Sequence, residues 1–205
     1  MTLAARLGRL GTATLGEAWP AARLVKVRLG PIAHDMVAAG PALPVRCRPG
    51  DNLALHRAIA AAEPGAVLVV DYGGSLKSGP FGEIMALACQ MRGIVGLVID
   101  GAVRDSQAIA ALGFPVFCRG LDIRGTTKQD PGVIGEPITL SGAEIGPGDM
   151  IVADADAVLV LSAEDAPAAA VAGEVRVAKE AAIMDRIRGG ETTLDILGLR
   201  GIGER

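Results

Sequence analysis

Short apolar runs and helical patterns alternate through the centre of the chain. The runs at residues 66–71 (AVLVVD) and 94–100 (IVGLVID) are brief and rich in β-branched side chains, as buried strands are. Residues 83–92 between them predict a helix, because apolar side chains recur at helical spacing and Gly93 follows as a terminator. The predicted apolar stripe of this helix consists of Ile84, Leu87, Ala88 and Met91.

Further elements extend the alternation on both sides. Helices are also predicted at residues 12–17, 53–62 and 107–112, and a third strand at residues 115–118. Thr12 or Thr14 is the candidate N-cap of the first of these helices. Residues 66–118 therefore predict a β-loop-α-β-α-β unit, a layered α/β arrangement with right-handed crossovers.

After residue 133 the pattern changes to short strands separated by tight turns. Strands are predicted at residues 137–140, 143–145, 150–153 and 157–161, in an antiparallel meander. Residues 162–165 (SAED) are typical of a capping box and open a long helix through about Arg188, which ends at Gly189-Gly190. We expect the mostly apolar tail at residues 192–199 to dock on a neighbouring subunit.

Composition and charge narrow the class of protein. The 205 residues suit one domain, spanning 1–205, with a full hydrophobic core. The net charge of −3 argues against a nucleic-acid partner, which requires a basic surface. The three widely spaced cysteines fit neither a disulfide framework nor a CxxC metal site. Because the chain shows neither a secretory signal pattern nor an apolar run of about 18 residues, we expect a cytoplasmic protein with no membrane partner.

The start of the helix at residue 83 is a candidate anion seat. The first backbone N–H groups of a helix have no partner within the helix, and its dipole places partial positive charge there. A glycine-rich loop that ends at Gly82 lets an anion approach these groups closely. The alternative is that residues 79–82 are merely a turn into the helix.

Arg104 and Asp105 follow directly after the predicted strand at residues 94–100, where ligand sites in α/β layers concentrate. The arginine guanidinium fits a carboxylate in a bidentate manner, and the aspartate is a hard oxygen ligand. Magnesium binds through only one or two protein carboxylates and keeps several waters, so a single aspartate is enough. The alternative is an ordinary Arg/Asp surface pair.

These motifs together resemble a known family. Residues 82–105 (GEIMALACQMRGIVGLVIDGAVRD) carry the strongest match, supported by segments 64–71, 113–120, 124–128 and 147–161. They resemble the class II pyruvate aldolases that act on 4-hydroxy-4-methyl-2-oxoglutarate and 4-carboxy-4-hydroxy-2-oxoadipate, a family that also holds the regulator of ribonuclease activity A proteins. The resemblance runs from about Thr12 to Leu199. It implies a layered β/β/α swivelling-domain-like fold with a long C-terminal helix, assembled as a homotrimer or a hexamer.

The resemblance also implies roles for particular residues. Asp105 matches the aspartate that binds Mg²⁺ or Mn²⁺, with waters completing the shell. Arg104 matches the arginine that contacts the keto oxygen of a small 2-oxo acid substrate and stabilises the enolate. The matching turn, whose backbone amides hold the pyruvyl carboxylate, comprises Gly82, Glu83, Ile84 and Met85.

Two glutamates are the candidates for proton transfer. Glu83 stands where the aldolases usually place an aspartate, so its carboxylate is displaced by one methylene. Glu180 is a candidate for the family's glutamate that a neighbouring subunit contributes; the alternative is an ordinary helix charge paired with Lys179 or Arg176. Lys128 either lines the mouth of the pocket or is an ordinary loop charge. His56 is expected to have a helix-face or packing role instead of binding a metal.

The resemblance leaves two functions open. One is metal-dependent retro-aldol cleavage of 4-hydroxy-4-methyl-2-oxoglutarate-type acids to pyruvate, together with oxaloacetate decarboxylation. The alternative is a non-catalytic regulator that binds an RNA-degrading endonuclease. Methyltransferase activity is disfavoured, because no strand is followed by a GxGxG-type cofactor loop.

Overall fold

The computed structural model describes residues 1–200 and residue 202. Among these residues, nine strands form the main sheet, in the order β1-β11-β10-β3-β4-β5-β6-β2, with β7 paired to β3. The strands of this sheet are β1 (Arg23–Leu24), β2 (Gly30–Pro31), β3 (Ala38–Arg46), β4 (Val67–Ser75), β5 (Gly96–Val103), β6 (Val116–Leu121), β7 (Val133–Ile134), β10 (Met150–Ala153) and β11 (Val158–Leu161). A separate hairpin pairs β8 (Ile138–Leu140) with β9 (Ala143–Ile145).

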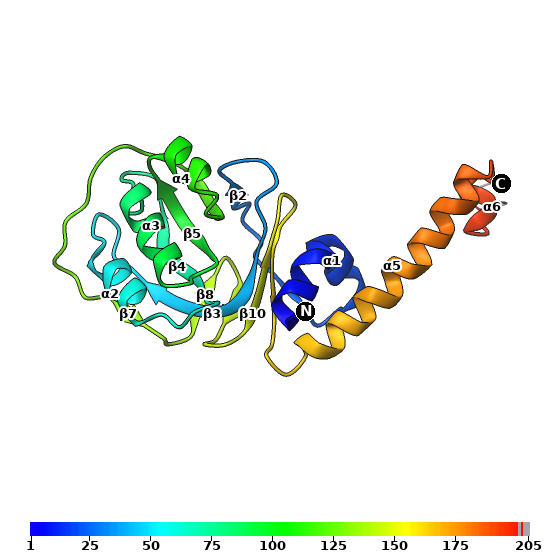
Figure 1. The fold of residues 1–205 in the computed structure, drawn as a ribbon, viewed down its shortest axis with the longest axis horizontal. Coiled ribbons are helices and arrows are strands. Elements are labelled where there is room, and N and C mark those ends of the chain that lie inside the picture. Colours follow the sequence, from blue (N-terminus) through cyan, green and yellow to red (C-terminus); the bar gives the residue numbers. More distant parts are fainter. Residues whose placement is uncertain (201, 203–205) are drawn as a thin grey trace.

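The four strands β3, β4, β5 and β6 are parallel neighbours, so their carboxyl ends meet at one edge of the sheet. The helices in the connections are α2 (Leu53–Ala61), α3 (Glu83–Met91) and α4 (Ser106–Leu112). They lie together over the same part of the sheet (Figure 1) and share its largest apolar core. The predicted β-loop-α-β-α-β order is confirmed, and the α/β fold class with it.

The predicted apolar stripe of α3 is wrong. The side chains of Ile84 and Met91 are 83% and 78% exposed, whereas the helix buries Met85, Ala86 and Cys89. Since α3 is apolar on nearly every side, its sequence supports two stripes, and packing chooses between them. The small side chains of Ala86 and Cys89 allow the helix axis to approach the sheet closely.

The predicted antiparallel meander is also only partly correct. β10 and β11 are antiparallel neighbours, but β10 pairs on its other side with β3 instead of β9. The turn before β10 explains this arrangement, because the backbone N–H of Ala42 donates to the carbonyl oxygen of Asp149 at 2.7 Å, and that of Gly148 donates to the carbonyl oxygen of Ala42 at 3.0 Å. The turn therefore joins β10 to the edge of β3 and leaves β8 and β9 as a hairpin of their own.

The first helix, α1 (Leu3–Ala18), begins before the helix predicted at residues 12–17 and is capped by Thr2. It breaks at Gly11, whose φ of 76° lies in the left-handed region. Neither Thr12 nor Thr14 caps the second half. The cap comes from Asp154, whose carboxylate accepts hydrogen bonds from the N–H of Thr12 at 2.7 Å and from its hydroxyl at 2.6 Å. A residue 142 positions away supplies the cap that the sequence pattern assigned to a local threonine.

The long C-terminal helix is confirmed as α5 (Ala166–Arg188) and is followed by α6 (Thr193–Ile196). Only the first part of α5 is buried, where it packs on α1; the rest extends away from the body of the protein and carries α6 at its far end (Figure 1). Within the described chain, no helix is both long and apolar enough to span a membrane. Leu194 and Leu197 are 49% and 55% exposed, so docking of the tail on a neighbouring subunit stays a prediction.

Candidate active site

The carboxyl end of β5 and the first turn of α3 meet at Arg104 and Asp105. The N–H of Arg104 donates to the carbonyl oxygen of Phe81 at 2.9 Å, which ties the end of the strand to the loop before the helix. Asp105 has a φ of 56° and a ψ of 34°, a left-handed conformation that aspartate tolerates better than most residues. Asp105 precedes α4, yet its side chain makes no capping bond there. Its Oδ2 instead accepts from the N–H of Glu83 at 3.2 Å.

Gly82 makes this close approach possible. A Cβ atom at this position would overlap Asp105 Oδ2 and would lie 3.1 Å from both Cγ and Nε of Arg104. Any side chain at residue 82 would therefore push the Arg104-Asp105 pair away from the start of α3. The pair itself is loosely associated, with 3.7 Å between Arg104 Nε and Asp105 Oδ2, and both side chains remain accessible to a ligand.

A hollow of about 160 Å³ opens at this junction. Its lining residues are Asn52, His56, Gly82, Ile84, Met85, Arg104, Asp105 and Lys128. The sequence predicted seven catalytic, substrate-binding or metal-binding residues. Five of them border this cavity, namely Gly82, Ile84, Met85, Arg104 and Asp105. Glu83 stands in the same helix turn, but its side chain is exposed and only its backbone N–H contacts Asp105.

Glu180 is not brought to this hollow within the chain. It lies on α5, which runs on the opposite side of the main sheet from α3 (Figure 1). Its Oε1 is 2.7 Å from Arg176 Nε, an ion pair that was the alternative expected from the sequence. The suggestion that Glu180 completes the site of a neighbouring subunit stays a prediction.

Asn52 and His56 border the hollow, although the sequence pattern assigned them no functional role. Lys128 also lines the hollow, which agrees with the first of the two roles predicted for it. Burial lowers the pKa of His56, and the nearby cation of Lys128 lowers it further. The signal available in the sequence was the spacing of Asn52 and His56, which places both on one side of α2. Lys128 reaches the hollow from a loop far along the chain, so no local pattern could pair it with Asn52.

Asp51 holds that loop in place. Its carboxylate accepts hydrogen bonds from the hydroxyl of Thr127 at 2.6 Å and from the N–H groups of Gln129 at 2.7 Å and Leu53 at 2.9 Å. Burial by itself would raise the pKa of this carboxyl, but these hydrogen bonds outweigh burial and lower the pKa to about 2. Asp51 therefore joins the start of α2 to the residues on both sides of Lys128.

We expect Asp51→Asn to make the free energy of unfolding depend less on pH in the acid range. The pKa of about 2 in the folded protein lies below the ordinary 3.8, so the stabilisation by the carboxylate is complete above about pH 4 and is lost as the pH falls toward 2. At neutral pH the variant should lose about 2 kcal/mol of unfolding free energy, because buried donors lose a charged acceptor. Urea unfolding between pH 2 and pH 7 measures both effects. An equal pH dependence of the unfolding free energy in both proteins between about pH 4 and pH 2 would contradict the first, and equal stability at pH 7 would contradict the second.

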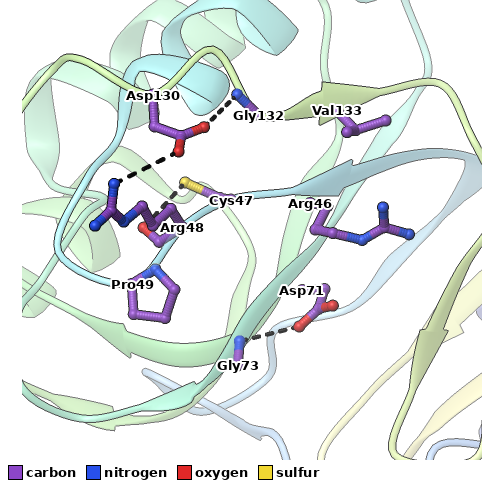
Figure 2. A pocket seen from close by; sticks show the side chains of 9 residues that line it. All are labelled: Arg46, Cys47, Arg48, Pro49, Asp71, Gly73, Asp130, Gly132 and Val133. Carbon is purple, nitrogen blue, oxygen red and sulfur yellow. Dashed lines mark hydrogen bonds and ion pairs between the residues drawn. The ribbon is translucent and has the colours of Figure 1, made fainter.

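A second hollow, of about 370 Å³, lies nearby at the ends of β3 and β4. Its two aspartates already have partners: the Asp71 carboxylate accepts from the N–H of Gly73 at 2.9 Å, and Asp130 Oδ2 is 4.0 Å from Arg48 Nη1 (Figure 2). Cys47 is buried there, and burial raises the pKa of its thiol to about 12, so the thiolate is scarce at neutral pH. This hollow is larger, but it presents no set of free groups comparable with Arg104, Asp105 and the first turn of α3.

Comparison with known proteins identifies the family of this chain. Residues 12–160 match the RraA-like family, described as Aldolase/RraA. The chain belongs to this family. A protein of Halalkalibacterium halodurans named "Putative 4-hydroxy-4-methyl-2-oxoglutarate aldolase" is 42% identical over 131 residues, which are 64% of this chain and 62% of that protein. The match thus spans less than two thirds of the length of this relative.

Several solved structures share the fold. The RNA-processing inhibitor RraA from Thermus thermophilis is 26% identical, with a TM-score of 0.68 over 73% of this chain and 91% of that one. A Streptomyces coelicolor protein, described as an unusual member of the RNase ES inhibitor RraA protein family, reaches a TM-score of 0.77 at 25% identity over 89% of this chain and 96% of that one. A Geobacillus kaustophilus protein named S-adenosylmethionine: 2-dimethylmenaquinone methyltransferase is 28% identical, with a TM-score of 0.70 over 73% of this chain and 93% of that one.

The donor set of this Aldolase/RraA chain suits one type of metal ion. The described residues contain no group of three or more His, Cys, Asp or Glu side chains placed to share a metal. Zinc sites of the usual kind need three or four such ligands, whereas Mg²⁺ and Mn²⁺ sites accept one carboxylate with waters and substrate oxygens. Asp105 supplies that carboxylate at the edge of an open hollow, so the residues present fit a water-rich divalent cation.

Proposed function

We propose that this protein cleaves 2-oxo acids of the 4-hydroxy-4-methyl-2-oxoglutarate type to pyruvate in a divalent-metal-dependent retro-aldol reaction, and that it also decarboxylates oxaloacetate. The observation that carries the proposal is the convergence of the first turn of α3, Arg104 and Asp105 on one hollow. The name of the relative at 42% identity supports the same reaction class.

Each group has a distinct task. In the first turn of α3 the N–H of Glu83 donates to Asp105 and that of Met85 donates to the carbonyl oxygen of Gly82. The N–H of Ile84, in the partial positive charge of the helix start, would hold the substrate carboxylate. Arg104 would lie against the keto oxygen and stabilise the negative charge that develops there. Asp105 would hold Mg²⁺ or Mn²⁺, and the bound cation would supply Lewis-acid polarisation of the keto group.

In the aldol reaction the C4 hydroxyl gives its proton to a base and becomes a carbonyl, while the electrons of the C3–C4 bond pass into the pyruvate enolate. Protonation of the enolate at C3 then yields pyruvate. Oxaloacetate reaches the same enolate by loss of CO₂ and has no hydroxyl proton to lose. The decarboxylation therefore needs Arg104 and Asp105 but not the base.

Glu83 and Glu180 are the proposed sources of that base. Glu83 is exposed in the turn that holds Asp105, so a water between its carboxylate and the hollow could carry the proton. Glu180 would have to arrive from another copy of the chain, which requires the homotrimer or hexamer that the family resemblance implies. A function that depends on Glu180 would therefore be lost on dissociation into monomers.

The second candidate is a regulator that binds an RNA-degrading endonuclease, motivated by the likeness to the RNA-processing inhibitor from Thermus thermophilis. A regulator needs no accessible carboxylate beside an arginine and an anion seat. It is thus distinguished from the enzyme by whether Asp105 and a metal are required for its action.

A pyruvate-release assay tests the proposal directly. We expect turnover of 4-hydroxy-4-methyl-2-oxoglutarate and oxaloacetate in the presence of Mg²⁺ or Mn²⁺, and its loss with EDTA. Absence of metal-dependent turnover for both substrates would overturn the enzyme proposal in favour of the regulator. Turnover of oxaloacetate alone would show that enolate formation is intact and that the placement of Glu83 does not support aldol cleavage.

A further inference from the structure

One polar atom beside the candidate site lacks a partner. Asn52 is only 5% exposed, and its Nδ2 donates to the carbonyl oxygen of Pro80 at 2.8 Å and lies 3.6 Å from Met85 Sδ. Because Pro80 O can only accept, this contact sets the orientation of the amide and turns Oδ1 away from Pro80. Oδ1 is buried and accepts no hydrogen bond from any described residue.

The position of Asn52 indicates where a partner would come from. A buried acceptor without a hydrogen bond is destabilising, so such atoms usually meet a donor that the isolated chain lacks. Asn52 lines the hollow that also holds Arg104, Asp105 and Lys128. Neither cation donates to Oδ1, although both border the same space. The missing donor is therefore expected to be a water or a bound molecule, and a bound molecule would come from the hollow that Asn52 lines.

The charges around Asn52 restrict what that donor can be. Carboxylate groups of a ligand are attracted to Arg104, Lys128 and the first turn of α3, and they have no proton to offer an amide oxygen. A neutral O–H group is the remaining donor on a hydroxylated 2-oxo acid. Oxaloacetate and pyruvate in their keto forms carry no such group.

We propose that Asn52 Oδ1 accepts a hydrogen bond from the carbinol hydroxyl of 4-hydroxy-2-oxo acids and thereby selects these acids over substrates that lack it. This inference rests on the proposed function and adds to it a residue that determines the substrate class. Sites built to bond a substrate hydroxyl discriminate strongly against analogues without one, since a buried polar group is then left unpaired. Asn52 acts on binding and orientation of the hydroxyl, and the base that removes its proton is a separate group.

The test compares two substrates in Asn52→Ala and Asn52→Leu. We expect the ratio of kcat/KM for 4-hydroxy-4-methyl-2-oxoglutarate to that for oxaloacetate to fall about 10²-fold in both variants. Inhibition by 2-oxoglutarate, which has the same dicarboxylate backbone without the C4 hydroxyl and methyl groups, should change much less than the KM of the hydroxylated substrate. Gln90→Leu is the matched control, because Gln90 Nε2 also donates to a backbone carbonyl, that of Leu112 at 2.7 Å, but lies outside the hollow.

The outcomes separate the inference from the function on which it rests. An equal fall for both substrates would make Asn52 a purely structural residue, and an unchanged ratio would mean that a bound water satisfies Oδ1; either result overturns this inference while the proposed function stands. If the wild-type protein turns over neither substrate, the proposed function fails and this inference fails with it. Urea unfolding of each variant checks the fold, and if the leucine variant does not fold, the alanine variant decides.

Discussion

Replacement of Asp105 by asparagine is expected to lower kcat/KM for both substrates about 10³-fold or more. The metal's charge stabilisation amounts to several kcal/mol, and about 4 kcal/mol corresponds to that factor. Asp105 supplies the sole carboxylate that lines the hollow among the described residues, so no neighbour can replace it. Asparagine is the informative substitution, because it tolerates the left-handed backbone at φ 56° and keeps an oxygen that can accept from the N–H of Glu83.

Two measurements check this expectation. The rate of pyruvate release gives the kinetic effect. Calorimetric titration with Mn²⁺ shows whether the loss of the carboxylate charge also weakens cation binding. Asp122→Asn is the matched control, since Asp122 lies close by but is paired with Arg124 and does not line the hollow. Activity of the Asp105→Asn protein within about tenfold of wild type would rule out a metal held by this carboxylate.

Replacement of Arg104 by alanine is expected to lower kcat for both substrates by about 10²- to 10³-fold, the typical effect of losing one group that stabilises a developing oxyanion. Both substrates should respond alike, because both pass through the same enolate. Arg104→Lys should restore only part of the rate, since the guanidinium fork lies against Gly82 in a geometry that an ammonium group cannot reproduce. The backbone bond from Arg104 to Phe81 survives either substitution, so the fold should persist.

Steady-state kinetics of the two Arg104 variants provide the check. Arg124→Ala is the comparison, because this arginine is ion-paired with Asp122 and absent from the lining of the hollow, although a Cβ on the next residue, Gly125, would lie 3.9 Å from Arg104 Nη1. A rise in KM without a fall in kcat would contradict the assignment, since it would mean that Arg104 binds the ground state and the transition state equally. A large effect on one substrate alone would also contradict it.

The main elements of the site could be predicted because each depends on local chemistry. Gly82 precedes a helix start, and Arg104-Asp105 follow an apolar run that becomes β5. In a β-loop-α-β unit the helix N-terminus and the carboxyl end of the next strand lie at the same edge of the sheet. The sequence therefore indicated not only these residues but also their proximity, which the hydrogen bond between Glu83 N–H and Asp105 Oδ2 makes explicit.

Other features depend on contacts between distant segments, and the sequence pattern missed or misassigned them. The apolar surface of α3 runs nearly all round the helix, so its periodicity could not tell which side the sheet would cover; packing buried Met85, Ala86 and Cys89. The cap of the second half of α1 also depends on a distant contact. The carboxylate of Asp154 accepts from the N–H of Thr12, and it takes the place of the local threonine hydroxyl that the sequence pattern predicted.

The sequence by itself determined the family, the order of strands and helices between residues 66 and 118, and the nearness of a helix start to Arg104 and Asp105, since these features depend on short stretches of chain. Only the tertiary structure decided what surrounds that seat. In the folded chain the hydrogen bonds of Asp51 hold the loop that places Lys128 at the hollow. Asn52 Oδ1 is buried without a partner among the described residues, and Glu180 lies away from the hollow of its own chain. Such features arise when segments far apart in sequence pack together, and no local pattern encodes which polar atom that packing leaves unpaired.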